Sequence, residues 1–236
     1  MRYRRRLRRT AVVLPACVFV LAFCIGYGDS EGGSDEGTSG ADSGRDGQVY
    51  EARTFNSKLR LRVFAIVEED GVEELKEVGG TPADEPLRIP RCARWWVEPL
   101  DDARTLEWQA LAEEVRRADI PALDLPGDTA DGHLAHLAGL KNLRELYLDW
   151  TDITDAGLAH LTGLKNLREL DLGYTKITDA GLAHLKGLKN LRVLYLAHTK
   201  ITDAGLAHLK GLKSLRVLYL RATKITDAGL THLTGM

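Results

Sequence analysis

A repeat of 24 residues runs through the C-terminal half of the chain. The segment LRELDLGYTKITDAGLAHLKGLKN (residues 167–190) recurs almost unchanged, and Leu143, Leu167, Leu191 and Leu215 lie one period apart. A fixed period of this length indicates stacked units, because a single unit cannot bury its own apolar face. We therefore expect a solenoid, an architecture that presents an extended surface to binding partners.

Each unit is expected to contain one short strand and one short helix. Apolar and polar residues alternate in LRELDL, so alternate side chains point into the solenoid. Thr178 and Asp179 precede Ala-Gly-Leu and predict the start of a helix that ends at Gly187. The inward set of this unit is Leu167, Leu170, Leu172, Ile177, Leu182, Leu185 and Leu188. With a degenerate first unit at Ile120, five strands are expected near residues 120–126, 143–149, 167–173, 191–197 and 215–221.

The repeats resemble a known family. The phrase ITDAGL recurs in the units, and the wider pattern is similar to LxxLxLxx(C)xxITDxxL, the cysteine-containing type of leucine-rich repeat. Threonine stands at the cysteine position here, as Thr151, Thr175, Thr199 and Thr223. The resemblance covers about residues 120–236 and implies an α/β leucine-rich repeat solenoid. Such a solenoid has parallel strands on its concave face, where most ligands bind, and short helices on its convex face.

Residues 1–27 are expected to be a signal peptide or membrane anchor. Six arginines and no acidic residue in residues 1–10 precede the apolar run AVVLPACVFVLAFCIGY, which is the pattern of an export signal. Three fates remain open. They are lipidation of Cys24, signal cleavage near Gly26–Gly28, and retention as an uncleaved membrane anchor. Phe23 stands where a lipoprotein box usually has a small residue. Each predicts an extracytoplasmic protein of the cell envelope, membrane-anchored or secreted.

Two segments separate this signal from the repeats. Residues 28–47 contain Gly, Ser and acidic residues without a large apolar side chain, which predicts a flexible linker. Residues 48–119 are expected to form a small leading segment, with a strand over 58–67 paired with residues 49–55. A helix over 106–117, with Trp95 and Trp96 nearby, is expected to cap the array. The array over residues 120–236 ends without such a cover, so we expect either a truncated chain or an edge used in assembly.

No sequence feature predicts catalysis. The chain has no phosphate loop, metal-binding pattern or nucleophile motif, and we expect no enzymatic activity, cofactor or metal. One histidine recurs at the same helical position in each unit, where it is expected to bond neighbouring turns rather than bind a metal. The recurring threonines are expected to bond loop backbone groups along the stack. The histidine row is His136, His160, His184, His208 and His232.

Candidate ligand-binding residues lie where the units differ from one another. Outward positions of the strands vary between units, and exposed aromatic and arginine side chains are frequent in binding hot spots. Charge also varies along the array, with nine acidic and four basic residues in 120–171 but three and ten in 172–236. This gradient indicates a partner of complementary polarity. The candidate residues are Tyr147, Asp149, Trp150, Asp171, Tyr174, Tyr195, His198, Tyr219 and Arg221.

The sequence therefore predicts an exported, membrane-tethered protein that binds another protein or a peptide through its concave face. The alternative is a structural envelope component that self-associates through its open repeat edge. Nucleic acid is not an expected partner, because the basic residues lack the interleaved aromatics of such surfaces.

Overall fold

The structure is a computed structural model that describes residues 52–69, 72–90 and 94–234. The sequence-based predictions for residues 1–27, including Cys24, and for the linker over 28–47 lie outside the described residues. The structural statements that follow concern the described ranges.

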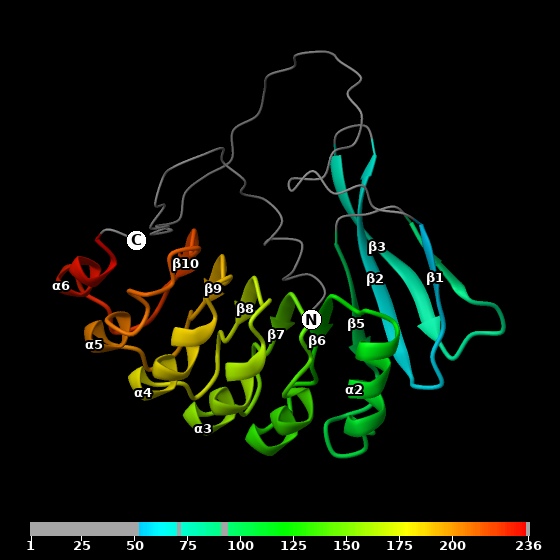
Figure 1. Cartoon of the computed structure of the whole chain (residues 1–236), viewed down its shortest axis with the longest axis horizontal. Coiled ribbons are helices and arrows are strands. Elements are labelled where there is room, and N and C mark those ends of the chain that lie inside the picture. Colours follow the sequence, from blue (N-terminus) through cyan, green and yellow to red (C-terminus); the bar gives the residue numbers. More distant parts are fainter. Residues whose placement is uncertain (1–51, 70–71, 91–93, 235–236) are drawn as a thin grey trace, which may run out of the picture.

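Eight strands form one continuous sheet in the order β10-β9-β8-β7-β6-β5-β2-β3 (Figure 1). The five repeat strands are parallel and centred where the sequence predicts them, but each is only three residues long. They are β6 (Ala122–Asp124), β7 (Glu145–Tyr147), β8 (Glu169–Asp171), β9 (Val193–Tyr195) and β10 (Val217–Tyr219). Because β5 (Arg94–Pro99) pairs in parallel with β6, the leading segment extends the sheet of the repeats.

Short helices lie on the other side of the repeat strands. In Figure 1 the strands β6 to β10 line the inner side of an arc and the helices line its outer side. The first unit has a 3₁₀ helix alone, and each of the next four has a single α-helical turn, followed in three of them by a 3₁₀ turn. These elements are η1 (Asp131–Leu137), α3 (Asp155–Leu158), η2 (Ala159–Gly163), α4 (Asp179–Leu182), η3 (Ala183–Gly187), α5 (Asp203–Leu206), α6 (Asp227–Leu230) and η4 (Thr231–Leu233).

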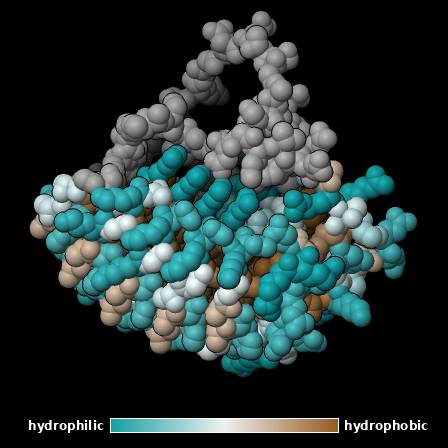
Figure 2. Space-filling model, in the orientation of Figure 1, coloured by the Kyte–Doolittle hydropathy of each residue, from teal (hydrophilic) through white to brown (hydrophobic). Residues whose placement is uncertain are grey.

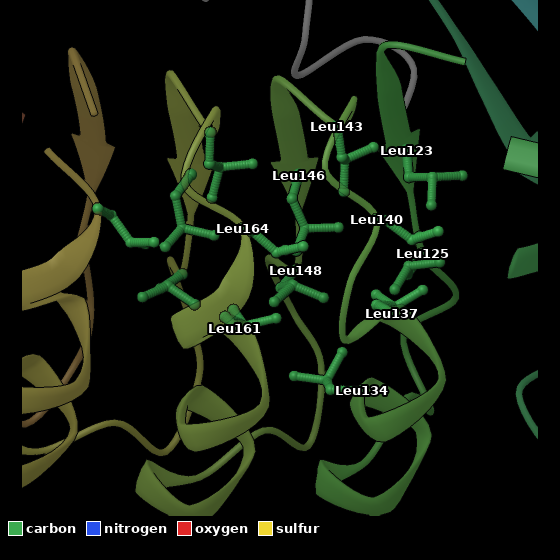
Figure 3. Close-up of a cluster of buried hydrophobic side chains, with 14 of the residues drawn as sticks. Leu123, Leu125, Leu134, Leu137, Leu140, Leu143, Leu146, Leu148, Leu161 and Leu164 are labelled. Carbon is green, nitrogen blue, oxygen red and sulfur yellow. The ribbon is translucent and has the colours of Figure 1, made fainter. Parts of the chain in front are cut away.

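Leucine side chains fill the space between the two layers. Figure 3 shows them pointing inward from both strands and helical turns. All seven residues of the predicted inward set, from Leu167 to Leu188, have no exposed surface, which confirms that part of the prediction. Each fully buried leucine contributes about 1.5–3 kcal/mol to folding, so the stack of leucines supplies most of the driving force.

A carboxylate ladder joins consecutive units on the helical side. The Asp155 carboxylate accepts hydrogen bonds from the Thr178 backbone N–H at 2.8 Å and from the Thr178 hydroxyl at 2.5 Å. The ladder consists of Asp131–Thr154, Asp155–Thr178, Asp179–Thr202 and Asp203–Thr226. Thr178 does begin α4, as predicted, but its hydroxyl binds the preceding unit and makes no capping hydrogen bond to its own helix.

Glycine in the first helical turn is required by this ladder. A Cβ at Gly181 would overlap the Asp155 carboxylate, and Gly157, Gly205 and Gly229 stand in the same relation to the preceding aspartate. The glycine of the recurring Asp-Ala-Gly sequence is therefore explained by its contact with the aspartate of the preceding unit. One unit considered alone does not contain this contact.

The leading segment differs from its prediction in strand pairing. The expected partnership between residues 49–55 and 58–67 is wrong, since β1 (Arg53–Phe55) pairs with β4 (Leu87–Ile89). Strand β2 (Leu61–Glu69) pairs with β3 (Val72–Thr81) and with β5. Apolar residues occur on both faces of β2 and β5, which allows this central position. Trp95 faces the main core, whereas Trp96 stacks on Phe64 on the opposite face with ring centroids 5.4 Å apart.

A helix stands between this segment and the repeats. Helix α2 (Trp108–Arg117) buries Trp108, Leu111, Ala112 and Val115. Trp108 donates its indole N–H to the Ala103 carbonyl at 2.8 Å and stacks on His133 of η1, with ring centroids 4.8 Å apart. Among the described residues, no helix has the length and apolar composition needed to cross a membrane.

Candidate binding surface

Backbone geometry just beyond the strands determines the exposed surface. Alternation along β7 places Leu146 and Leu148 inside, so continued extended backbone would also bury Trp150. Instead Trp150 has a positive φ of 62°, and its side chain is 41% exposed. Tyr174, His198 and Ala222 occupy the same place in the next three units, with φ of 58°, 58° and 54°.

The exposed rings stack on one another from unit to unit. Trp150 and Tyr174 have ring centroids 3.8 Å apart, and Tyr174 and His198 have centroids 4.1 Å apart. The backbones are held in register by the next unit, because the Trp150 N–H donates to the Gly173 carbonyl at 3.0 Å. We call Trp150, Tyr174 and His198 the ring row. These predicted site residues therefore form one contiguous surface.

The threonine that follows each of these positions is buried in its own turn. The Thr175 hydroxyl donates to the Leu172 carbonyl at 2.6 Å, three residues earlier in the same unit. Thr151, Thr199 and Thr223 make the equivalent bond. The expectation that these hydroxyls bond along the stack is therefore wrong, because the left-handed residue turns the threonine back onto the end of its own strand.

Two tyrosines form a second stack on the strand face. Tyr195 and Tyr219 lie opposite each other in β9 and β10, with ring centroids 4.4 Å apart and planes 6° apart. Both are half-buried. Asp171 lies between Tyr147 and Tyr195 in the sheet. It is fully buried, and one carboxylate oxygen accepts the Gly173 N–H at 2.8 Å.

Tyr147 belongs to a polar cluster with the leading segment. Arg94 in β5 donates to both carboxylate oxygens of Glu145, at 3.1 and 2.9 Å, to the Tyr147 hydroxyl at 2.9 Å, and to Glu169 at 3.2 Å. The Tyr147 hydroxyl donates to Glu145 at 2.6 Å. The Glu145 charge is the main cause that raises the pKa of the Arg94 guanidinium above its usual range. Tyr147 is only 5% exposed, so neither it nor Asp171 presents the open surface expected from the sequence.

The other seven predicted residues are half-buried or exposed. Asp149 is half-buried beside the ring row, and Arg221 is exposed just before Ala222. Figure 2 shows that hydrophilic residues dominate this view of the repeats, with hydrophobic residues visible only in small areas.

Sequence reasoning missed the cations beside the ring row. A lysine follows two residues after Tyr174, His198 and Ala222, and all three lysines are exposed. Lys176 forms an ion pair with Asp152 at 2.7 Å. We call Lys176, Lys200 and Lys224 the lysine row. The sequence Tyr-Thr-Lys followed by His-Thr-Lys one period later was the available signal.

The repeat histidines and acidic residues are side chains of types that can act as metal ligands or as bonding partners between turns. In the described ranges, no group of three or more His, Cys, Asp or Glu side chains could hold a metal ion. The repeat histidines make no side-chain hydrogen bond to the described residues, so the expected bonds to neighbouring turns are not found. The stacked rings and charges of this surface are side-chain types that can contact a partner.

Comparison with known proteins agrees with the repeat geometry. A family model described as leucine rich repeat matches residues 141–201 and 165–225. Residues 141–225 are leucine-rich repeats. The match does not distinguish the cysteine-containing type, so threonine at the cysteine position remains a prediction. No curated protein sequence matches the chain.

Two solved internalin structures are similar to part of the chain. An internalin C2 from Listeria monocytogenes str. 4b F2365 is 32% identical, with a TM-score of 0.44 over 54% of this chain and 51% of its own. An internalin (inlF) from the same strain is 20% identical, with a TM-score of 0.35 over 54% of this chain and 48% of its own. The chain spans about half the length of these two structures.

Proposed function

We propose that the chain is an exported leucine-rich repeat protein that binds another protein or a peptide, without catalysing a reaction. The proposed site is the strand face around the Tyr195–Tyr219 stack together with the ring row. Leucine-rich repeat proteins commonly act as binding scaffolds, and stacked units provide a rigid surface for such contacts. The positive first residues and apolar run over 1–27 support export.

The ring row is the observation that carries this proposal. The same left-handed turn is built with Ala222 in the last described unit, so the turn does not require an aromatic ring. A non-glycine residue in this region costs about 1–2 kcal/mol, and bulky side chains are rare there. Three consecutive units nevertheless place a large ring at the turn and expose it. Surface aromatics that the fold does not require are typical of binding hot spots.

Two finer features belong to this proposal. We propose that helix α2 acts as the N-terminal cap, a role supported by the stacking of Trp108 on His133 of the first unit. The Gly, Ser and acidic composition of residues 28–47 suits a tether that holds the repeats away from a membrane. Membrane attachment would be through residues 1–27, by lipidation of Cys24 or by an anchor.

A capture experiment tests the proposal. The affinity-tagged full chain, expressed in its source cells, is compared with a variant that carries Tyr195→Ala, Tyr219→Ala and His198→Ala. We expect an envelope protein to co-purify with the wild type and to be lost with the variant. A control with Lys186→Ala and Lys210→Ala, on the convex side, should retain it.

Two results would oppose the proposal. Capture of the same partner by the triple variant would place recognition elsewhere on the chain. Recovery of the chain's own copies alone, with size in light scattering that rises with concentration, would favour the self-association alternative.

A further inference from the structure

Unpaired cations gather at one end of the ring row. Lys200, Arg221 and Lys224 are exposed, and none forms an ion pair or side-chain hydrogen bond with the described part of the chain. The lysine backbones are in register, because the Lys200 N–H donates to Ile177 at 3.0 Å and the Lys224 N–H to Ile201 at 2.9 Å. Equivalent positions in neighbouring units lie about 4.8 Å apart. Three positive charges therefore surround His198 within two adjacent units.

Negative charge lies at the other end of the same surface. Asp149 and Asp152 flank Trp150, and Asp152 pairs with Lys176. The surface is thus polar along the solenoid axis, with carboxylates near the first ring and free cations near the last. An anionic group is attracted more strongly to the His198 end, where the cations are unpaired, than to the Trp150 end, where Lys176 neutralises Asp152.

The stacking geometry restricts what the rings can contact. Tyr174 is covered on one face by Trp150 and on the other by His198, with planes 15° and 14° apart. Nucleobases bind such residues by stacking on an open ring face. Tyr174 therefore presents only its edge, which carries the positive part of the aromatic quadrupole. Ring edges and ammonium groups together suit carboxylates and apolar side chains better than bases or sugar rings.

We propose that the ring row and the cations beside it bind an acidic peptide segment of the partner. Carboxylates of the segment lie against Lys200, Lys224 and Arg221, and its apolar side chains lie along the edges of Tyr174 and His198. The acidic run faces the last two units, because the unpaired cations lie there, whereas Lys176 near the first rings is already paired with Asp152. This inference deepens the proposed function and rests on it, since it names the chemistry of the partner for part of the same surface.

Fluorescence anisotropy measures the interaction directly. The probe is a fluorescein-labelled peptide of six Gly-Glu repeats. The full chain is added to this probe in increasing amounts at low salt. The test variant carries Lys200→Glu and Lys224→Glu. Its matched control carries Lys186→Glu and Lys210→Glu, two exposed lysines that are also one period apart but lie on the helical side. Circular dichroism verifies that each variant is folded.

We expect the test variant to bind about tenfold more weakly, because two exposed charge pairs are replaced by repulsion. The control should change affinity by less than about twofold, and added salt should weaken wild-type binding. Equal weakening in both variants would overturn the proposal, because it would show attraction to net charge alone. A single-stranded oligonucleotide that displaces the peptide at lower concentration than unlabelled peptide would also overturn it.

Tryptophan fluorescence locates the bound peptide. Trp150 is the one exposed tryptophan among the four of the chain, since Trp95, Trp96 and Trp108 are 5–7% exposed. Bound peptide should therefore protect Trp150 from quenching by acrylamide, and absence of protection would remove the ring row from the site. If the peptide fails to bind while the capture experiment still finds a partner that the triple variant loses, this inference fails and the proposed function stands.

Discussion

Replacing Gly181 with alanine tests the carboxylate ladder. Gly181 lies in the first turn of α4, where alanine ordinarily stabilises a helix by about 1 kcal/mol. Here its Cβ would overlap the Asp155 carboxylate and lie 3.1 Å from Ile177 Cγ2. That carboxylate accepts both hydrogen bonds from Thr178, so moving it aside breaks the link between the two units.

The expected loss follows from these contacts. A hydrogen bond to a charged group contributes about 1.5–3 kcal/mol, so losing most of two such bonds outweighs the helix gain of about 1 kcal/mol. We expect Gly181→Ala to lower the free energy of unfolding by about 2–4 kcal/mol. Urea denaturation followed by circular dichroism measures this, with an unchanged m-value as the condition for comparison.

Two further variants separate the ladder from other causes. Gly187→Ala is a control in the same unit, because its Cβ closely meets only the end of the Lys165 side chain, which can swing away. In an Asp155→Ala background the overlap is removed, so Gly181→Ala should be neutral or stabilising by up to about 1 kcal/mol. If Gly181→Ala destabilises the fold equally in both backgrounds, overlap with the Asp155 carboxylate does not explain why glycine is needed at this position. The proposed role of the ladder is then refuted.

Three other outcomes follow from single contacts. Ala222→Gly should raise the free energy of unfolding by about 0.5–1 kcal/mol in urea denaturation, because glycine adopts the positive φ without strain. Hydrogen bonds from Thr226 lower the pKa of Asp203, so that carboxylate stabilises the fold at neutral pH and stops doing so as pH falls through the lowered pKa. Thr226→Val should return the pKa of Asp203 toward its ordinary value in an NMR titration. Arg94→Met should lower the free energy of unfolding by about 2 kcal/mol in urea denaturation, because two carboxylates lose their cation.

The interior of the repeats could be predicted because its period is fixed. Alternation in LRELDL and the recurring leucines place every inward residue of a unit, and all of them are buried. The strands are nevertheless shorter than predicted at both ends. Bulky aromatic residues such as Trp and Tyr are rare in the left-handed region, so no recurring residue type indicated the turn at Trp150, Tyr174 or His198.

Contacts between distant parts of the chain could not be predicted in the same way. The partner of Asp155 lies 23 residues away and becomes its neighbour only when two units stack. Arg94 contacts Glu145 and Glu169 because β5 continues the sheet of the repeats. The sequence of the leading segment does not indicate this strand pairing. This cluster explains why Tyr147, chosen for its variable position, is buried. For the same reason, which variable residues are available to a partner depends on a segment outside the repeats.

The backbone strain at the left-handed residues can be compared with the energy that stacking of their rings returns. Each left-handed residue costs about 1–2 kcal/mol, and stacking between neighbouring rings returns about 0.5–1.5 kcal/mol for each pair. The stacking within the ring row therefore offsets only part of the strain, and Ala222 has no ring to offset it at all. Glycine at these positions would avoid the cost altogether. Since folding alone gives no reason to place Trp150, Tyr174 and His198 at strained and exposed turns, their retention argues for a contact outside the chain.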